Sequence, residues 1–244
     1  MKKRILSILL LCCMVLTMLP TTVLAADGPM DTIPKYDVSI DVYNRTSDIS
    51  IKDSRSYYIY SSVPDKLRDT WAWDKKIFIK GDKAAPHVFI DGVNIEMSPS
   101  SKGPAIELNK KASAYIYFIG KNSSLQGADG RAAIQKNRSE GQLYVLARTG
   151  TTVTCKGGDK AAGIGGSYAT RNISNGYYNG DMFGHGVNMH FGSQSNPDYW
   201  GGTIAAIGGE GGAGIGGSYK GRGSEIYIYG GTVSAQGGEG GAGI

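Results

Sequence analysis

The amino-acid sequence predicts an all-β fold, a right-handed, single-stranded parallel β-helix with about 28–30 residues per coil. Residues 201–219 (GGTIAAIGGEGGAGIGGSY) begin again at Gly230 as GGTVSAQGGEGGAGI. A small residue followed by isoleucine also recurs at intervals of 28, 30, 51 and 29 residues, at Ile106, Ile134, Ile164, Ile215 and Ile244. Repetition at a fixed period is the signature of a solenoid.

One of these intervals is long because it contains extra residues. The 51 residues between Ile164 and Ile215 exceed the following interval of 29 by 22. We interpret the surplus as a loop inserted into one coil, at about residues 171–200. The other coils stack on one another at about 4.8 Å, and each buries a column of small and branched side chains.

Short runs of β-branched and aromatic residues precede most of the repeated isoleucines, and such runs indicate strands. They are residues 87–91 (HVFID), 115–119 (YIYFI), 142–146 (QLYVL) and 225–229 (EIYIY). Alternation along a strand puts Ile116 and Phe118 on the buried face, and Tyr227 and Tyr229 on the outer one. Residues 115–244 contain no run of good helix formers, which excludes leucine-rich and ankyrin-type repeats.

Residues 1–25 have the features of a secretory signal peptide. Three basic residues at 2–4 precede an apolar run over 5–19, and Val23-Leu24-Ala25 follows as a cleavage site. The run is shorter than the about 20 residues that span a bilayer. We therefore expect cleavage after Ala25, no membrane insertion afterwards, and a secreted, extracellular or cell-wall-associated protein.

The remaining chain divides by composition, since 28 of the 37 glycines lie between residues 157 and 244. Residues 27–80 are less regular, and we expect them to form an N-terminal cap and the first coils. Strands are predicted there at 37–42, 48–52, 57–60 and 76–80, with a short helix or loop over 62–73. Residues 81–244 are expected to be β-helix repeats, truncated inside a coil at the C-terminus.

Charge and cysteine content narrow the function classes. Loss of residues 1–25 removes three of the 26 basic residues and none of the 21 acidic ones, so the net charge falls from +5 to +2. Without a clustered basic patch, a nucleic-acid partner is not expected. Cys155 is the only cysteine after residue 25, and it occupies the repeat position of Ala206, which predicts a small buried residue.

Two glycine-rich motifs suggest cofactors or metals. Residues 212–217 fit the dinucleotide pattern G-x-G-x-x-G, but no helix is predicted after them, so glycines at tight corners are the better interpretation. Asp159, Glu210 and Glu239 recur once per coil. Calcium usually takes six to eight oxygens, so a Ca²⁺ site there needs carboxylates from stacked coils to converge. We otherwise expect a hydrated row of carboxylates, no metal site and no cofactor.

The predicted insertion holds most of the candidate ligand-binding residues. Exposed aromatic rings can stack on sugars, and Asp or His side chains can hydrogen-bond their hydroxyls. The carbohydrate-binding candidates in it are Tyr177, Tyr178, His185, Asp198, Tyr199 and Trp200. Tyr168 and Tyr219 both follow Gly-Ile-Gly-Gly-Ser and are a second candidate set. The alternative is that these aromatics pack the loop onto the β-helix wall, with Phe191 buried in a strand at residues 187–191, or that they stabilise coil stacking.

Several segments resemble known protein families. Residues 88–95 (VFIDGVNI), 103–106 (GPAI), 115–127 (YIYFIGKNSSLQG) and 132–137 (AAIQKN) resemble exported carbohydrate-binding β-helix proteins of Gram-positive, clostridia-like bacteria. The GGAGIGG units resemble repeats of large surface proteins from the same bacteria. The resemblance implies a right-handed parallel β-helix, polysaccharide binding without demonstrated catalysis, and Ca²⁺ as an optional ligand.

Catalysis has weaker support in the sequence. Gly184-His185-Gly186 is similar to a short motif of polygalacturonase-type glycoside hydrolases, which would imply an Asp cluster and an Arg-x-Lys element on neighbouring coils; neither is found. Asp181 and Asp198 are close in sequence, but glycoside hydrolysis requires two carboxyl groups that flank one bond. The leading hypothesis is therefore a non-catalytic glycan-binding module or adhesin. A β-helix polysaccharide lyase or glycoside hydrolase and a purely structural surface stalk are the alternatives.

Overall fold

The computed structural model describes residues 33–98, 103–109, 111–137, 140–168 and 184–244. The chain divides into two compact units, Met1–Pro34 and Lys35–Ile244, and all strands belong to the second. The single helical turn among the described residues is the 3₁₀ turn η1 (Asp65–Leu67). The unit Lys35–Ile244 is therefore all-β, as the sequence predicts.

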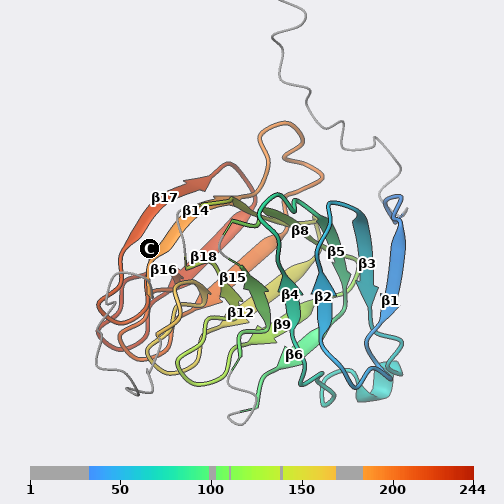
Figure 1. Ribbon diagram of the computed structural model, residues 1–244, viewed down its shortest axis with the longest axis horizontal. Helices are drawn as coiled ribbons and strands as arrows, with labels where there is room; N and C mark the ends of the chain where they lie inside the picture. Colours follow the sequence, from blue (N-terminus) through green and yellow to red (C-terminus); the bar gives the residue numbers. More distant parts are fainter. Residues whose placement is uncertain (1–32, 99–102, 110, 138–139, 169–183) are drawn as a thin grey trace, which may run out of the picture. The chain divides into compact units, whose positions relative to one another are not determined.

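The strands form three sheets, which we name A, B and C (Figure 1). Sheet A consists of β1 (Val38–Asp41), β3 (Ser56–Tyr60), β5 (His87–Asp91), β8 (Ala114–Ile119), β11 (Leu143–Ala147), β14 (Gly186–Phe191) and β17 (Gly223–Ile228). Sheet B consists of β2 (Ile49–Ile51), β4 (Ile77–Ile79), β7 (Ile106–Leu108), β10 (Ile134–Gln135), β13 (Ile164–Gly165) and β16 (Ile215–Gly216). Sheet C consists of β6 (Asn94–Glu96), β9 (Ser123–Gln126), β12 (Thr152–Lys156), β15 (Thr203–Ile207) and β18 (Thr232–Gln236).

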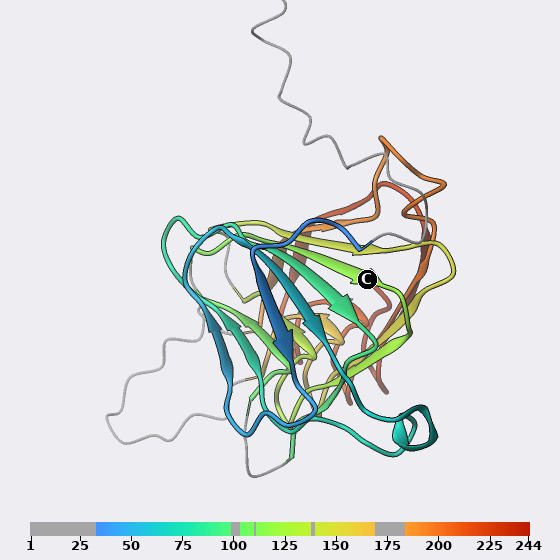
Figure 2. The same ribbon diagram turned by 90° about the vertical axis from the view of Figure 1, so that its right-hand side faces the viewer.

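All strand pairs recorded among the described residues are parallel. From β5 onward the chain visits sheets A, C and B in turn, and we call each such passage a coil. Trp73 forms a parallel bridge to Ile95, so it takes the sheet C position between β3 and β4. Figure 2 shows the three sheets around one interior. This topology is compatible with a parallel β-helix.

The repeated isoleucines form one interior file on sheet B. Ile106, Ile134, Ile164 and Ile215 pair in register, as the spacing predicts, and each is fully buried. Two isoleucines of the N-terminal segment extend the file, Ile49 and Ile77. At the other end, the amide of Ile215 donates to the carbonyl of Gly243 at 2.9 Å, directly before Ile244. The file places one branched side chain per coil inside the three sheets.

The same register buries Cys155. It pairs with Ala206, as predicted from the repeat, and lies in the interior with no exposed surface. Burial raises the pKa of its thiol. The neutral thiol therefore behaves as a small apolar core residue, which confirms the prediction.

Asparagines at the corners link each coil to the next. The side-chain oxygens of three of them accept a backbone N–H from a residue 30 positions later, at 2.8–3.0 Å. The pairs are Asn94 with Ser124, Asn122 with Thr152, and Asn137 with Ser167. Each bond satisfies a backbone amide and adds a side-chain link between two neighbouring coils.

The glycine pairs of the repeat mark places where coils approach too closely for a side chain. A Cβ built on Gly158, Gly209 or Gly238 would lie 2.0, 2.0 or 1.9 Å from the carbonyl oxygen of the preceding coil. Any larger residue there would have to push two coils apart. The repeated Gly-Gly is therefore a packing requirement, not a phosphate-binding turn.

The N-terminal segment contains the four strands expected from its pattern, β1 to β4, and η1 lies within the predicted helix or loop at 62–73. The insertion needs correction. Residues 186–191 form β14, a regular strand of sheet A between β11 and β17. The surplus residues therefore form two segments, one on each side of β14, because the alternating pattern of residues 187–191 fits the same sheet as its neighbours.

One turn residue of each late coil has a left-handed backbone. Gly130, Gly211 and Gly240 have φ of 72°, 69° and 73°, and Lys160 holds the same repeat position with φ of 60°. A side chain in this conformation costs about 1–2 kcal/mol. Lys160 carries this cost where the other three coils use glycine.

We predict that Lys160→Gly raises the free energy of unfolding by about 1 kcal/mol, because it removes this cost. The exposed contact of Lys160 with Asp159, at 3.6 Å, contributes little. Urea denaturation measures the change. Lys160→Ala, which keeps a Cβ, is the control and should stay close to the parent; an equal gain in both variants would contradict the explanation.

Candidate functional site

A column of aromatic rings crosses the outer face of sheet A. In-register positions of five strands hold His87, Tyr115, Tyr144, His190 and Tyr227. Successive ring centroids lie 4.7, 4.5, 4.4 and 5.0 Å apart, with interplanar angles of 5–16°. We call this set the ring column. Its spacing is close to the about 4.8 Å between neighbouring strands.

The ring column is a poor platform for sugars, because its rings cover one another. An aromatic side chain that stacks on a sugar must present its face. In a parallel stack the faces are in contact with the neighbouring rings, and only edges point outward. The column therefore resembles a stabilising ladder of cross-strand pairs more than a binding surface.

A second apolar cluster lies beside the ring column on the same sheet. Its buried members are Tyr58, Phe89, Ile119, Leu146 and Trp200. The ring of Trp200 lies 5.1 Å from that of Tyr117, and the side chain is 5% exposed. Of the predicted sugar-binding residues, Trp200 is thus a packing residue that fixes its loop on sheet A. Its burial favours the packing alternative.

Thr149 anchors the segment around Trp200. Its hydroxyl donates to the carbonyl of Asp198 and accepts the N–H of Gly201 at 3.0 Å. Tyr199 packs edge-on against Trp200 at 4.7 Å and is half-buried. The side chain of Asp198 is exposed. Asp198 and Tyr199 therefore lie on the surface beside the buried indole.

Tyr168 and Tyr219, the second candidate set, contact each other. Tyr168 and Tyr219 meet edge-on at 6.0 Å and 75°, so they form no flat ladder. An ammonium group lies over each ring, from Lys160 at 5.8 Å and from Lys220 at 5.2 Å. These cations occupy ring faces that a sugar would need.

His185 has a backbone partner. Its Nδ1 accepts the N–H of Arg222 at 3.0 Å, which joins two coils. Tyr177, Tyr178 and Asp181 lie outside the described residues.

Two histidines of the ring column share one arrangement. His87 stacks on Tyr115 and its Nδ1 lies 3.0 Å from the hydroxyl of Tyr117. His190 stacks on Tyr227 and its Nδ1 lies 3.0 Å from the hydroxyl of Tyr229. Each histidine therefore meets a Tyr-Ile-Tyr segment of the next coil. Burial lowers the pKa of both imidazoles, because the protonated ring loses hydration.

The described residues also form a groove of about 770 Å³ beside sheet C. Five successive coils line it: Thr70 and Ala72; Glu96, Met97 and Ser98; Gln126 to Asp129; Lys156 to Asp159; and Gly209 with Glu210. Glu96, Gln126 and Lys156 pair in register along one side. Asp129, Asp159 and Glu210 hold one repeat position on the other.

The groove is polar and mostly acidic. It presents four carboxylates and one ammonium group, and these side chains are exposed. No group of three or more His, Cys, Asp or Glu side chains in the described part of the chain is placed to hold a metal ion. The groove therefore offers several hydrogen-bond acceptors, an amide and an ammonium donor, in a row that follows the stacked coils.

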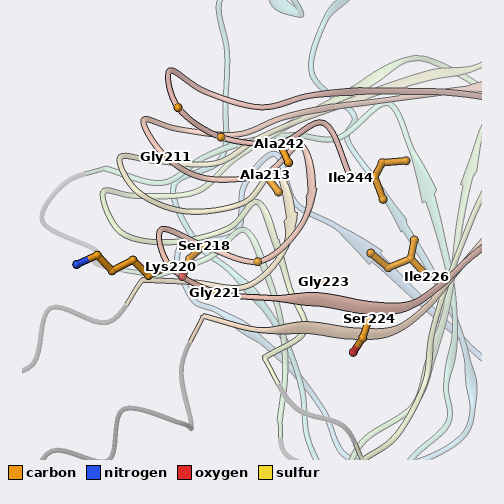
Figure 3. A pocket seen from close by; sticks show the side chains of 13 residues that line it. Gly211, Ala213, Ser218, Lys220, Gly221, Gly223, Ser224, Ile226, Ala242 and Ile244 are labelled. Carbon is orange, nitrogen blue, oxygen red and sulfur yellow. The ribbon is translucent and has the colours of Figure 1, made fainter.

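A smaller hollow of about 510 Å³ lies at the last coil (Figure 3). Its lining is mainly glycine and alanine, with Ile226 and Ile244 on one side and Lys220 on the other. It offers few polar groups for a specific ligand. The larger groove is the better candidate site.

Comparison with known proteins identifies no relative of this chain. No family model, no curated protein and no solved structure matches this chain. None of the described residues belongs to a helix with the length and hydropathy of a membrane span.

The sequence contains signals for both the ring column and the groove. Each of the runs 87–91, 115–119 and 225–229 has His or an aromatic residue at two of its outer positions, which predicts a ring column once the register is known. The groove residues precede or follow the repeated Gly-Gly and carry one acid per coil. Only the stacking shows that these positions face a common hollow.

We predict that Trp200→Ala lowers the free energy of unfolding by about 3 kcal/mol, because it removes a buried indole from the second apolar cluster. Urea denaturation measures the loss. Tyr199→Ala, next in the chain and half-buried, is the matched control and should cost clearly less. Equal costs for the two variants would show that Trp200 does not anchor the loop.

We predict that acidification weakens the fold through His87 and His190. Their native pKa lies below the ordinary value of 6.5, so the unfolded chain takes up protons first. The free energy of unfolding should therefore fall between about pH 7.5 and about pH 5. His87→Phe with His190→Phe keeps the stack and should reduce this dependence. The control variant, Tyr115→Phe with Tyr227→Phe, should retain the pH dependence. If the free energy of unfolding of the double histidine variant depends on pH as in the parent, His87 and His190 are not its source.

Proposed function

We propose that this chain is a secreted or cell-surface β-helix module that binds polysaccharide without catalysis, as a glycan-binding protein or adhesin. The observation that carries the proposal is the groove beside sheet C, which residues of five coils line and in which polar side chains recur at two repeat positions. Polysaccharides are themselves chains of repeated hydroxyl-bearing units. A repeated row of donors and acceptors matches such a ligand better than it matches a compact small molecule.

The scaffold suits binding because it holds the groove in place before the ligand arrives. Gln126 and Lys156 are the last residues of strands, and each strand is paired on both sides. Their backbone cannot relax without breaking sheet C. A preformed site loses less conformational entropy on binding than a loop that must become ordered.

The proposed architecture is a right-handed solenoid that is exported and loses residues 1–25 on the way. Parallel strands joined by crossovers are right-handed in most proteins, which supports this hand. A coil stack that depends on repetition needs no disulfide, and Cys155 is buried and unpaired. Both features fit an extracellular module with a single cysteine.

The acids of the groove favour binding over hydrolysis. A glycosidase holds its acid in an apolar pocket and places a second carboxyl group across the scissile bond. Asp129, Asp159 and Glu210 are all exposed, and they recur on one side of the groove. Their arrangement suits hydrogen bonds to sugar hydroxyls.

The test is a titration of the protein against plant, mucin and host-type polysaccharides by calorimetry, with an assay for released reducing or unsaturated ends. Gln126→Ala with Lys156→Ala should weaken binding at least about tenfold, because it removes two contacts from the groove. Gln236→Ala is the matched control, since it belongs to the same side-chain row but lies outside the groove lining.

The control variant should bind like the parent. Absence of binding to every polysaccharide, or equal loss in the two variants, would reject the groove as a glycan site. Released ends that depend on Asp129, Asp159 or Glu210 would instead identify a lyase or hydrolase.

A further inference from the structure

The groove follows the direction in which the coils stack, because residues of five successive coils line it. Glu96 pairs with Gln126, and Gln126 with Lys156, so one wall advances by one strand per coil. The facing acids follow the same step. Five coils are four steps of about 4.8 Å, which gives a length of about 19 Å. A ligand that uses the whole groove must be extended along the stack.

The floor of the groove is backbone. Gly127, Gly157, Gly158 and Gly209 line it. A Cβ on any of them would lie 2.0–2.3 Å from a backbone carbonyl oxygen of the protein, so these positions accept no larger residue. The groove therefore has four lining positions without a side chain, where the backbone itself faces a ligand.

The charges of the groove limit the class of polysaccharide that it can bind. Among the described lining residues, the four carboxylates are Glu96, Asp129, Asp159 and Glu210, and the one ammonium group is that of Lys156. Lys160, which is outside the lining, lies 3.6 Å from Asp159. A polymer with one carboxylate per sugar would place its charges along this row. Repulsion between like charges in a shared groove disfavours such a ligand.

From these observations, and on the basis of the glycan-binding function proposed above, we propose that the groove binds a linear, extended glycan without acidic groups, laid along the direction in which the coils stack. Neutral chains bind through hydroxyl hydrogen bonds to the carboxylates and to Gln126. Chains with amino groups gain an added attraction from the same carboxylates. Polyuronates are disfavoured by charge.

The experiment compares linear oligosaccharides of increasing length, from disaccharide to octasaccharide, in neutral and uronate forms. The affinity for the neutral series should rise by about tenfold or more until the chain spans the about 19 Å of the groove, and then stay constant. Uronate chains of equal length should bind at least about tenfold more weakly. Added salt should narrow this difference, since it screens the repulsion.

Charge reversal tests the selection directly. Asp129→Lys with Glu210→Lys should raise the affinity for the uronate chain relative to the neutral one by at least about tenfold. The control is Asp82→Lys with Glu140→Lys, which changes the net charge equally at exposed positions outside the groove lining. The control should leave the ratio of the two affinities unchanged.

The outcomes distinguish failure of this inference from failure of the proposed glycan-binding function. Equal or tighter binding of uronates, or full affinity already at the disaccharide, would overturn the extended, non-acidic ligand while leaving glycan binding intact. A matching shift in the control variant would also overturn it, because the selection would then come from net charge and not from the groove. Failure of every chain to bind would remove the proposed function itself.

Discussion

The close approach of successive coils at their glycines is the constraint on which the rest of the structure depends. At Gly158, Gly209 and Gly238 the neighbouring carbonyl lies where a side chain would begin. This contact restricts how each of these late coils can stack on the coil before it. The register of the stack brings the isoleucines of sheet B into one file inside the three sheets. Backbone pairing provides the regular spacing, and glycine makes that spacing attainable at the corners.

In-register stacking also explains why outward side chains form rows. A residue type that recurs once per coil lands about 4.8 Å from its counterpart. On sheet A these residues are rings, and at that distance rings stack face to face, which stabilises neighbouring coils and hides the faces. Beside sheet C the recurring residues are carboxylates and amides, which stay hydrated and accessible. The same geometry therefore gives a structural surface on one sheet and a candidate binding surface on another.

Much of the fold could be predicted from the sequence, because its signals are local and periodic. The isoleucine interval, the alternation in residues 115–119 and the repeat position of Cys155 each specify an environment that the structure confirms. The division of the insertion around β14 could not be predicted from the interval alone, since a total length does not show where extra residues leave and rejoin a sheet. The groove was missed for a related reason. Its walls come from positions about 30 residues apart, which only the three-dimensional stack brings together.

The position of Trp200 follows from a gap in the second aromatic row. Phe89 and Tyr117 occupy register-equivalent positions, but the next strand offers Leu146, which is too small to cover the ring of Tyr117. Trp200 reaches back from the segment after β14 and stacks there instead. Trp200 thus takes a place in the aromatic row that the repeat leaves without a ring. Because its indole is buried there, it is not available to contact a ligand. An insertion rich in aromatic residues is therefore weak evidence for sugar binding until the burial of each ring is known, whereas exposed polar groups that line a groove remain available to a ligand.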